Sequence, residues 1–333
     1  MTHRAASEVK TPKVSVIVPV YNTEKYVERA IVCLMEQTLQ DAEFIIIDDG
    51  SKDNSLNIIK QVIARYSERA GQVTLISREN RGVAATRAQG MELASGDYVI
   101  HLDSDDWAEL NWLEAMHSKA IEENADVVVC DYHTFYATKA TYIKQPVGID
   151  GVDCVKKLFT GDISNSNWNK LVLRTIFIEN GIYFHSGYNL GEDLFVTTRV
   201  FLNSKKIVAV NCALYHYNQC NISSLTFTVS FKSLDDYCEI VEMINSELIS
   251  KSLEKELSKE FTYLKLDLKA LLAYHSKGSL FRIKHALNVY PDSNALILKS
   301  KFRRLKIYYV LDVLGILWLI KLISKQGGVK CVK

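Results

Sequence analysis

Proline and glycine are scarce in this chain, with 4 and 15 respectively among 333 residues. Long disordered linkers are usually rich in these residue types, so we expect few such linkers here. The seven cysteines are odd in number, and no two of them are spaced C-x-x-C. The sequence therefore indicates neither a disulfide framework nor a zinc ribbon, and we expect buried or incidental thiols in a reducing cytosol.

Several sequence signals for nucleotide binding and targeting are also missing. There is no G-x-x-x-x-G-K-[ST] loop and no G-x-G-x-x-G after the first apolar run, which disfavours a P-loop NTPase and an NAD dehydrogenase. Residues 1–12 are polar and lack the apolar segment of a signal peptide. The apolar run at 307–320 is shorter than the ~20 residues that a membrane-spanning helix needs.

Apolar and amphipathic segments alternate regularly through the first part of the chain. Apolar runs typical of buried strands occur at 14–22, 43–51, 73–76, 98–101 and 126–131. Between them, segments with helical spacing of apolar residues occur at 24–37, 53–66, 82–94 and 109–124. This alternation predicts an α/β fold with a doubly wound, mostly parallel sheet flanked by helices.

The last third of the chain lacks this alternation and shows only helical patterns. The expected helices lie at 231–250, 253–276, 279–289 and 299–323. Length alone suggests about two domains. We therefore expect a catalytic domain over 12–228 and a helical C-terminal region over 229–333.

Three carboxylates follow the expected strand at 98–101 within four residues. They belong to Asp103, Asp105 and Asp106. Ligands bind outside the carboxyl ends of strands in open α/β sheets, and crowded carboxylates repel one another unless a cation relieves them. Hard cations such as Mg²⁺ prefer oxygen ligands. A cation or polar-ligand site is one interpretation, and a simple turn with an Asp that caps the next helix is the other.

Two further expected strands end in polar residues. Tyr21 follows the first strand, and Asp48 and Asp49 follow the second. The carboxyl ends of parallel strands share one edge, so these residues are expected near the acidic turn. An aromatic ring, an acid pair and an acid triplet suit a nucleotide with a metal. Tyr21 would stack on a base, Asp49 would accept from a ring N–H, and Asp105 would hold the metal on a diphosphate.

Read in order, these segments resemble the family 2 glycosyltransferases of GT-A fold. The resemblance covers residues 12–135, through the runs at 14–22, 48–55, 80–87 and 96–106. The Trp168–Leu171 stretch and the sequence GEDLF at 191–195 extend it to about residue 220. The helical third lies outside it.

The resemblance implies an inverting transfer of a sugar from a nucleotide-diphosphate sugar, with a UDP-sugar as the first expectation and Mg²⁺ or Mn²⁺ as cofactor. It also implies roles for single residues. Pro19, Tyr21 and Asp49 match positions that hold the base and ribose, and Arg87 matches a basic position near the nucleotide. Asp103 and Asp105 match the D-x-D motif, with Asp105 on the metal and Asp103 nearer the ribose.

The same resemblance makes Asp193 the catalytic base. A base must lie across the sugar from the diphosphate, so it should come from a distant segment, as Asp193 does. Without the resemblance, Glu192 and Asp193 are also explained as an acidic first helical turn. His216 is expected near the metal or diphosphate, or else as a partly buried structural histidine. Asn218 and Gln219 stand where family members often carry a basic residue.

The end of the chain is strongly basic. Residues 299–333 contain nine Lys or Arg and one acid, a net charge of +8, whereas residues 1–298 sum to −7. A basic-flanked apolar helix with Tyr308, Tyr309 and Trp318 suits a membrane interface. We therefore expect a peripheral protein on the cytoplasmic face of the inner membrane. The alternative is a helix docked on the protein or on another subunit. No motif for nucleic-acid recognition accompanies these charges, so nucleic acid is not an expected partner.

The expected acceptor is a glycan or a lipid-linked oligosaccharide in the synthesis of cell-surface polysaccharide. Two competing functions remain open at this stage. One is a non-catalytic module that binds a nucleotide sugar or glycan, against which the presence of Asp103, Asp105 and Asp193 argues. The other is a nucleotidyltransferase, against which the absence of a Gly-rich, Lys-bearing loop after the first strand argues.

Overall fold

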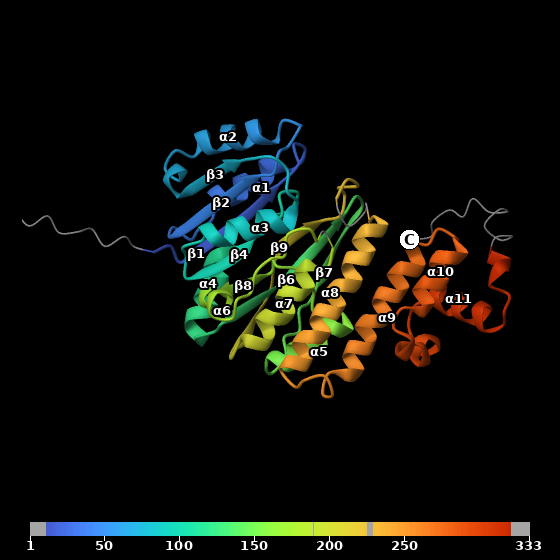
Figure 1. Ribbon diagram of the computed structural model, residues 1–333. Coiled ribbons are helices and arrows are strands. Elements are labelled where there is room, and N and C mark those ends of the chain that lie inside the picture. The colour runs from blue at the N-terminus through green and yellow to red at the C-terminus, as the bar shows by residue number, and fades with distance from the viewer. Residues whose placement is uncertain (1–10, 189, 225–228, 321–333) are drawn as a thin grey trace, which may run out of the picture. The chain divides into compact units, whose positions relative to one another are not determined.

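The computed structural model describes residues 11–188, 190–224 and 229–320. The chain divides into two compact units, residues 1–228 and 229–333, and each is described separately (Figure 1). The first unit is an α/β domain and the second is helical.

The α/β unit is built around one nine-stranded sheet. Its strands are β1 (Val14–Val20), β2 (Ala42–Asp48), β3 (Val73–Ser77), β4 (Tyr98–His101), β5 (Trp107–Ala108), β6 (Val127–Tyr136), β7 (Lys139–Ile143), β8 (Lys170–Leu173) and β9 (Ile207–Asn218). Its helices are α1 (Val27–Met35), α2 (Ser55–Arg65), α3 (Val83–Leu93), α4 (Trp112–Glu123), α5 (Gly151–Thr160), α6 (Arg174–Glu179) and α7 (Glu192–Asn203), with a short 3₁₀ helix at Ala70–Gln72.

The strand order is β3-β2-β1-β4-β8-β6-β9-β5, with β7 paired to β6. The first four strands pair in parallel, as the sequence predicted. The sheet also contains antiparallel pairs, because β8 inserts between β4 and β6 and runs antiparallel to both. The sheet is therefore mixed, although β6 keeps the direction of β4.

The central strands are mostly apolar because they are buried within the α/β unit. All of β1 except Pro19 is buried, and Pro19 lies beyond the last β1–β4 pair, Ile17 with His101. Helix α3 packs very closely on β1, since a Cβ added to Gly90 would lie 2.4 Å from Ile17 Cγ2. This close contact fixes α3 against the sheet, and Arg87 lies on α3 one turn before Gly90.

Hydrogen bonds join the loops that follow β1, β2 and β4. The Thr23 backbone N–H donates to Ser55 Oγ at 2.9 Å, and Thr23 Oγ1 donates to Ser104 Oγ at 3.1 Å. The Lys52 backbone N–H donates to Asn22 Oδ1 at 2.7 Å. The three strand ends that the sequence marked as polar therefore form one connected edge of the sheet.

The helical unit contains α8 (Phe231–Ser250), α9 (Ser258–His275), α10 (Leu280–Asn288) and α11 (Arg303–Val313), with 3₁₀ segments at Pro291–Lys299 and Leu317–Leu319. The expected continuous helix over 299–323 is wrong within the described residues, and 321–323 lie outside them. Gly315 has φ +70°, in the left-handed region that glycine favours, and it follows the end of α11. Among the described helices, none combines the length and apolar composition that crossing a bilayer requires.

A buried lysine connects three parts of the helical unit. Lys269 of α9 is fully buried, and its ammonium donates to the carbonyl oxygens of Leu287 and Val289 at 2.9 and 2.6 Å. It also donates to Asn294 Oδ1 at 2.6 Å. The ammonium thus satisfies carbonyl groups at the end of α10 that have no partner within that helix.

We predict that Lys269→Met destabilises the helical unit by about 3 kcal/mol, because the substitution leaves buried acceptors without a donor. Urea unfolding of the full chain, followed by circular dichroism, measures the change. Lys284→Met, an exposed change on α10, is the matched control and should alter stability by less than ~0.5 kcal/mol. Equal unfolding midpoints for both variants would contradict the assigned role of Lys269.

Candidate active site

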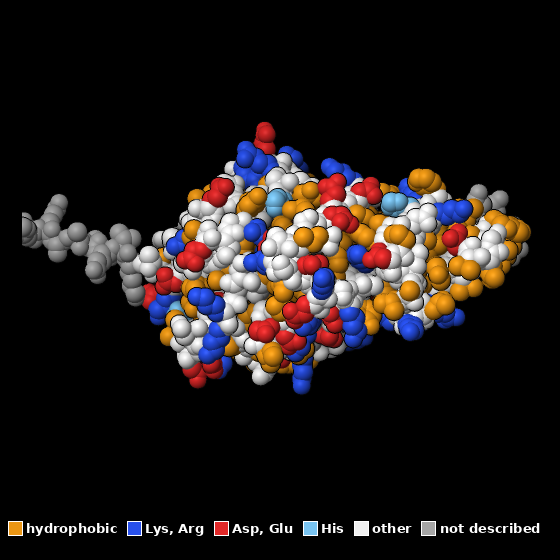
Figure 2. All heavy atoms as spheres, turned by 60° about the horizontal axis from the view of Figure 1, so that its bottom comes forward, with side chains coloured by type: hydrophobic (Ala, Val, Ile, Leu, Met, Phe, Trp, Pro, Cys, Tyr) orange, Lys and Arg blue, Asp and Glu red, His pale blue; other side chains and the backbone are white. Residues whose placement is uncertain are grey.

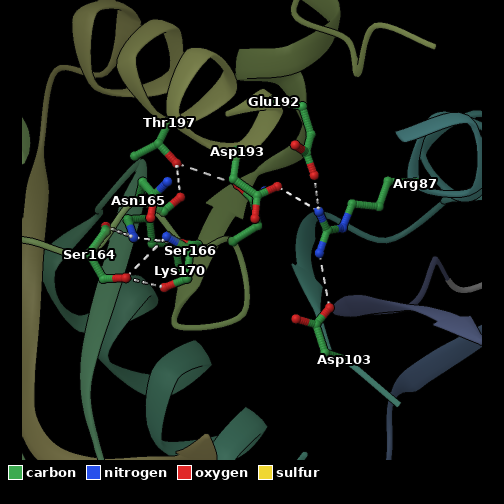
Figure 3. A network of polar contacts seen from close by, with 10 residues as sticks. Arg87, Asp103, Ser164, Asn165, Ser166, Lys170, Glu192, Asp193 and Thr197 are labelled. Carbon is green, nitrogen blue, oxygen red and sulfur yellow. Dashed lines mark hydrogen bonds and ion pairs between the residues drawn. The ribbon is translucent and has the colours of Figure 1, made fainter. Parts of the chain in front are cut away.

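The guanidinium of Arg87 lies at the centre of a cluster of carboxylates from separate segments (Figure 3). Arg87 Nη1 lies 3.0 Å from Glu192 Oε1 and 2.6 Å from Asp193 Oδ1, and Nη2 lies 3.0 Å from Asp103 Oδ1. Arg87 is only 4% exposed. Burial alone would lower its pKa, but Asp193, Asp103 and Glu192 outweigh burial and raise it above its ordinary value. The sequence predicted a contact with the nucleotide for Arg87 and did not predict this cluster.

The acid pair Glu192 and Asp193 forms the first turn of α7. Asp193 Oδ1 also accepts a hydrogen bond from Asn167 Nδ2 at 2.6 Å. Burial raises the pKa of Glu192 to about 8, and the charge of Asp193 adds to the shift while Arg87 opposes it. Burial likewise raises the pKa of Asp193, against the effect of Arg87. One guanidinium therefore faces more carboxylates than it can neutralise.

The acidic turn after β4 is held in place by a strand that comes much later in the chain. Tyr215 of β9 accepts a hydrogen bond from the Asp103 backbone N–H at 3.1 Å and donates to Asp106 Oδ2 at 2.8 Å. The Asn218 backbone N–H donates to Asp106 Oδ1 at 2.7 Å. Asp106 is fully buried and joins the turn to β9. The suggestion that it caps the next helix is wrong, since the residue at the cap of α4 is Asn111.

Asp105 lies on the same turn and is the residue expected to bind a metal. Its Oδ2 accepts from Asn221 Nδ2 at 2.8 Å, and its backbone carbonyl accepts from Asn218 Nδ2 at 3.0 Å. Burial raises the pKa of Asp105 to about 6, and Asp103 adds to the shift. The raised pKa means that negative charge is unfavourable here, a condition that a divalent cation would relieve. The oxygen chemistry of Asp103 and Asp105 therefore fits Mg²⁺ or Mn²⁺.

The expected metal ligand His216 has other neighbours. Its Nε2 lies 2.7 Å from Glu109 Oε1, and its ring stacks on Trp107 and His133 at centroid distances of 5.1 and 5.6 Å. Within the described part of the chain, no three His, Cys, Asp or Glu side chains are grouped so that they could hold a metal ion. A metal at Asp103 and Asp105 would therefore need ligands other than a third His, Cys, Asp or Glu side chain of the described residues.

The residues expected to hold the base and ribose lie at the ends of β1 and β2. Asp49 is buried, and its carboxylate accepts from the backbone N–H groups of Arg81 and Gly82 at 3.0 and 2.8 Å and pairs with Arg78 at 3.0 Å. Tyr21 follows β1 and is 49% exposed, so its ring is accessible. Asp49 thus fixes the backbone of the loop before α3 through its hydrogen bonds to Arg81 and Gly82.

Sequence reasoning missed the residues that support Asp193. Lys170 of β8 is buried and donates to the carbonyl oxygens of Ser164 and Ser166 at 2.7 and 2.6 Å (Figure 3). Burial lowers the pKa of Lys170 to about 7, and Asp193 opposes this shift. Lys170 therefore holds the segment that carries Asn167 to Asp193. The sequence signals for this segment were the resemblance at Trp168–Leu171 and the polar composition of residues 164–169, and neither pointed to contacts with Asp193.

A mixed α/β sheet with an acidic turn at its carboxyl edge, facing an acid pair on a later helix, defines the GT-A class of glycosyltransferases. Residues 15–181 match the model of the family described as glycosyl transferase family 2. The chain belongs to this family. The predicted GT-A fold is confirmed.

Known proteins agree with this assignment. The chain is 33% identical over 217 residues to the glycosyltransferase GlyA of Streptococcus pneumoniae. The matched region covers 62% of this chain but only 30% of GlyA. The crystal structure of S. aureus TarS residues 1–349 in complex with UDP-GlcNAc is similar in fold, with a TM-score of 0.70, 20% identity and coverage of 95% of this chain and 92% of that one. The mannosyltransferase PcManGT from Pyrobaculum calidifontis in complex with GDP-Man and Mn²⁺ matches with a TM-score of 0.52, 15% identity and coverage of 93% and 88%.

We predict that Tyr215→Phe destabilises the α/β unit by about 1–3 kcal/mol, because Asp106 and the Asp103 backbone N–H both lose a buried partner. Chemical denaturation measures the loss. Tyr136→Phe, which changes a ring that is 42% exposed, is the matched control and should leave stability nearly unchanged. Equal stabilities of the two variants would show that the Tyr215 hydroxyl does not hold the acidic turn.

Proposed function

We propose that this protein is an inverting glycosyltransferase that moves one sugar from a nucleotide-diphosphate sugar to a glycan or lipid-linked acceptor. The observation that carries the proposal is the pairing of Asp193 with Arg87, which in turn pairs with Asp103 of the acidic turn. Through Arg87, the carboxylate of Asp193 on α7 faces the acidic turn, whose Asp103 and Asp105 suit a metal. A UDP-sugar is the donor we favour, and the likeness to TarS bound to UDP-GlcNAc supports that choice.

In this proposal, Pro19, Tyr21 and Asp49 hold the base and ribose, with Asp103 near the ribose. Asp105, with Asp103 beside it, would hold Mg²⁺ or Mn²⁺, and the cation would neutralise charge on the departing diphosphate. The likeness to PcManGT with Mn²⁺ supports this cofactor. His216 is paired with Glu109 and has no role in the proposal.

Asp193 is the general base. The acceptor hydroxyl oxygen bonds to the anomeric carbon as the bond from that carbon to the diphosphate oxygen breaks, and the bonding electrons leave with the nucleoside diphosphate. The hydroxyl proton passes to the carboxylate of Asp193. Arg87 and Asn167 both donate to Oδ1, so we assign the proton to Oδ2. Attack from the side opposite the diphosphate inverts the anomeric centre.

We expect Asp193→Asn to lower turnover by about 10²–10⁴-fold, with donor affinity changed by less than ~2-fold, because the amide keeps the shape of the carboxylate but cannot take the proton. Release of UDP from UDP-sugars gives the turnover, and calorimetry gives the affinity. Asp162→Asn, the same chemical change at an exposed aspartate, is the control.

Two outcomes would count against the function proposed here. Weaker donor binding with normal turnover in Asp193→Asn would remove the base role. A wild-type protein that binds nucleotide sugars but never releases the nucleotide, with any acceptor or with water, would favour a non-catalytic binding module instead.

We also propose that the helical unit attaches the protein to an anionic membrane, on the cytoplasmic face of the inner membrane, where surface polysaccharide is made. Several apolar side chains on and after α11 are exposed, by 41–69%, namely Ile307, Val310, Val313, Leu314 and Trp318. Basic residues Arg303, Arg304 and Lys306 begin the same helix. Figure 2 shows hydrophobic side chains gathered on the surface of this unit. Exposed apolar groups beside cations suit the interface of an anionic bilayer.

The double substitution Val313→Glu with Leu314→Glu should weaken binding to phosphatidylglycerol vesicles by about ten-fold or more, since it removes apolar burial and adds repulsive charge. Vesicle sedimentation measures the binding. Ile178→Glu changes a residue on α6 that is equally exposed, at 62%, and should leave binding unchanged. Unaltered sedimentation of the double variant would favour a surface that packs on protein instead.

A further inference from the structure

The guanidinium of Arg87 contacts acidic residues on two sides of the site. Nη2 contacts Asp103 of the acidic turn at 3.0 Å, whereas Nη1 contacts Asp193 and Glu192 of α7 at 2.6 and 3.0 Å. Arginine keeps its charge at every pH at which the protein is folded, so one fixed positive charge serves all three carboxylates. A change in one of these ion pairs therefore alters the strength of the others.

The surroundings of Arg87 keep the guanidinium in this position. Phe184, which is 2% exposed, has its ring 6.0 Å from Arg87 Cζ. The same ring packs edge-on against His101 at 5.2 Å. Burial and the charge of Arg87 lower the pKa of His101 well below its usual value, so this imidazole is neutral and does not repel the guanidinium. The close contact of Gly90 with Ile17 fixes α3 itself.

Asp103 consequently has two competing partners. In the structure its carboxylate pairs with Arg87. The neighbouring carboxylate of Asp105 is half-buried and accepts a hydrogen bond from Asn221 Nδ2 at 2.8 Å, so it lies on the same turn within the hydrogen-bonded part of the site. A divalent cation that bound both carboxylates would draw Asp103 away from Arg87. The guanidinium, held by Phe184 and α3, would then pair more strongly with Asp193 and Glu192.

We propose that Arg87 is a positioning residue that couples the two sides of the site: it competes with the divalent cation for Asp103, and it holds Asp193 in place for the reaction. The proposal rests on the function proposed above. It predicts that loss of Arg87 acts in opposite directions on two measurable quantities. Cation binding should become tighter because the competitor is gone, while turnover should fall because Asp193 is no longer held.

The test uses the full-length protein and the variants Arg87→Met and Arg87→Lys. Calorimetry with Mn²⁺ alone, without donor and at one fixed pH for all variants, measures the cation affinity. We expect the Mn²⁺ dissociation constant of Arg87→Met to fall by about five-fold or more. Turnover of the UDP-sugar should fall by about 10²-fold. For both Mn²⁺ affinity and turnover, Arg87→Lys should lie between the wild type and Arg87→Met, because an ammonium keeps the charge but not the two-pronged geometry of a guanidinium.

Arg78→Met is the matched control, because Arg78 is also an arginine with a largely covered side chain, 10% exposed, and it pairs with a carboxylate, that of Asp49, at 3.0 Å. Its loss should change the Mn²⁺ dissociation constant by less than ~2-fold, since it does not touch the acidic turn. Asp105→Ala should abolish Mn²⁺ binding and so identify the site that calorimetry detects. Thermal unfolding of each variant shows that it is folded.

Unchanged or weaker Mn²⁺ binding in folded Arg87→Met and Arg87→Lys would overturn the coupling. Equal gains in Mn²⁺ affinity for Arg87→Met and Arg78→Met would also overturn it, because the effect would then follow from net charge alone. A wild-type protein that neither binds Mn²⁺ nor turns over any nucleotide sugar would instead refute the proposed function. The two failures are therefore distinguishable.

Discussion

The shared ion pair of Arg87 is the interaction on which the rest of the site depends. Three segments remote in sequence reach it: α3, the acidic turn and the first turn of α7. Breaking one half of a buried ion pair costs more than the pair contributes, because the remaining charge has no partner. The excess of carboxylates around Arg87 means that this cluster is not arranged for stability. These acids are crowded together despite the cost of burial and of mutual repulsion, which is typical of a functional site.

Supporting residues surround this cluster. Lys170 and Asn167 hold the α7 side, whereas Tyr215 and Asn218 hold the side of the acidic turn. Each of these groups makes its bonds to backbone or carboxylate oxygens that are buried. The acids can therefore be crowded without being displaced by their own repulsion. The site is rigid because its neighbours, and not the acids themselves, determine where the acids lie.

Local sequence patterns were sufficient to predict the edge of the sheet where the site lies. The polar ends of β1, β2 and β4 follow buried parallel strands, and parallel strands align their ends by geometry. The sequence could not predict β8, because this strand begins with Lys170, and a lysine is seldom buried unless the folded chain supplies partners for its ammonium. Nor could it predict the roles of Asp106 and Arg87. Their partners lie about a hundred residues away, and only the folded chain brings them together.

The dependence of the acidic turn on β9 has a consequence for how the protein is made. Asp106 precedes Tyr215 by 109 residues, and β8 and β9 join the sheet on either side of β6. Contacts of such long range form slowly because a large loop must close first. The first four strands can emerge from the ribosome and pair in order, but the acids among them acquire their final positions only after residue 218 has been synthesised. Premature release of the chain would yield an ordered sheet edge with the acidic turn not yet held in place.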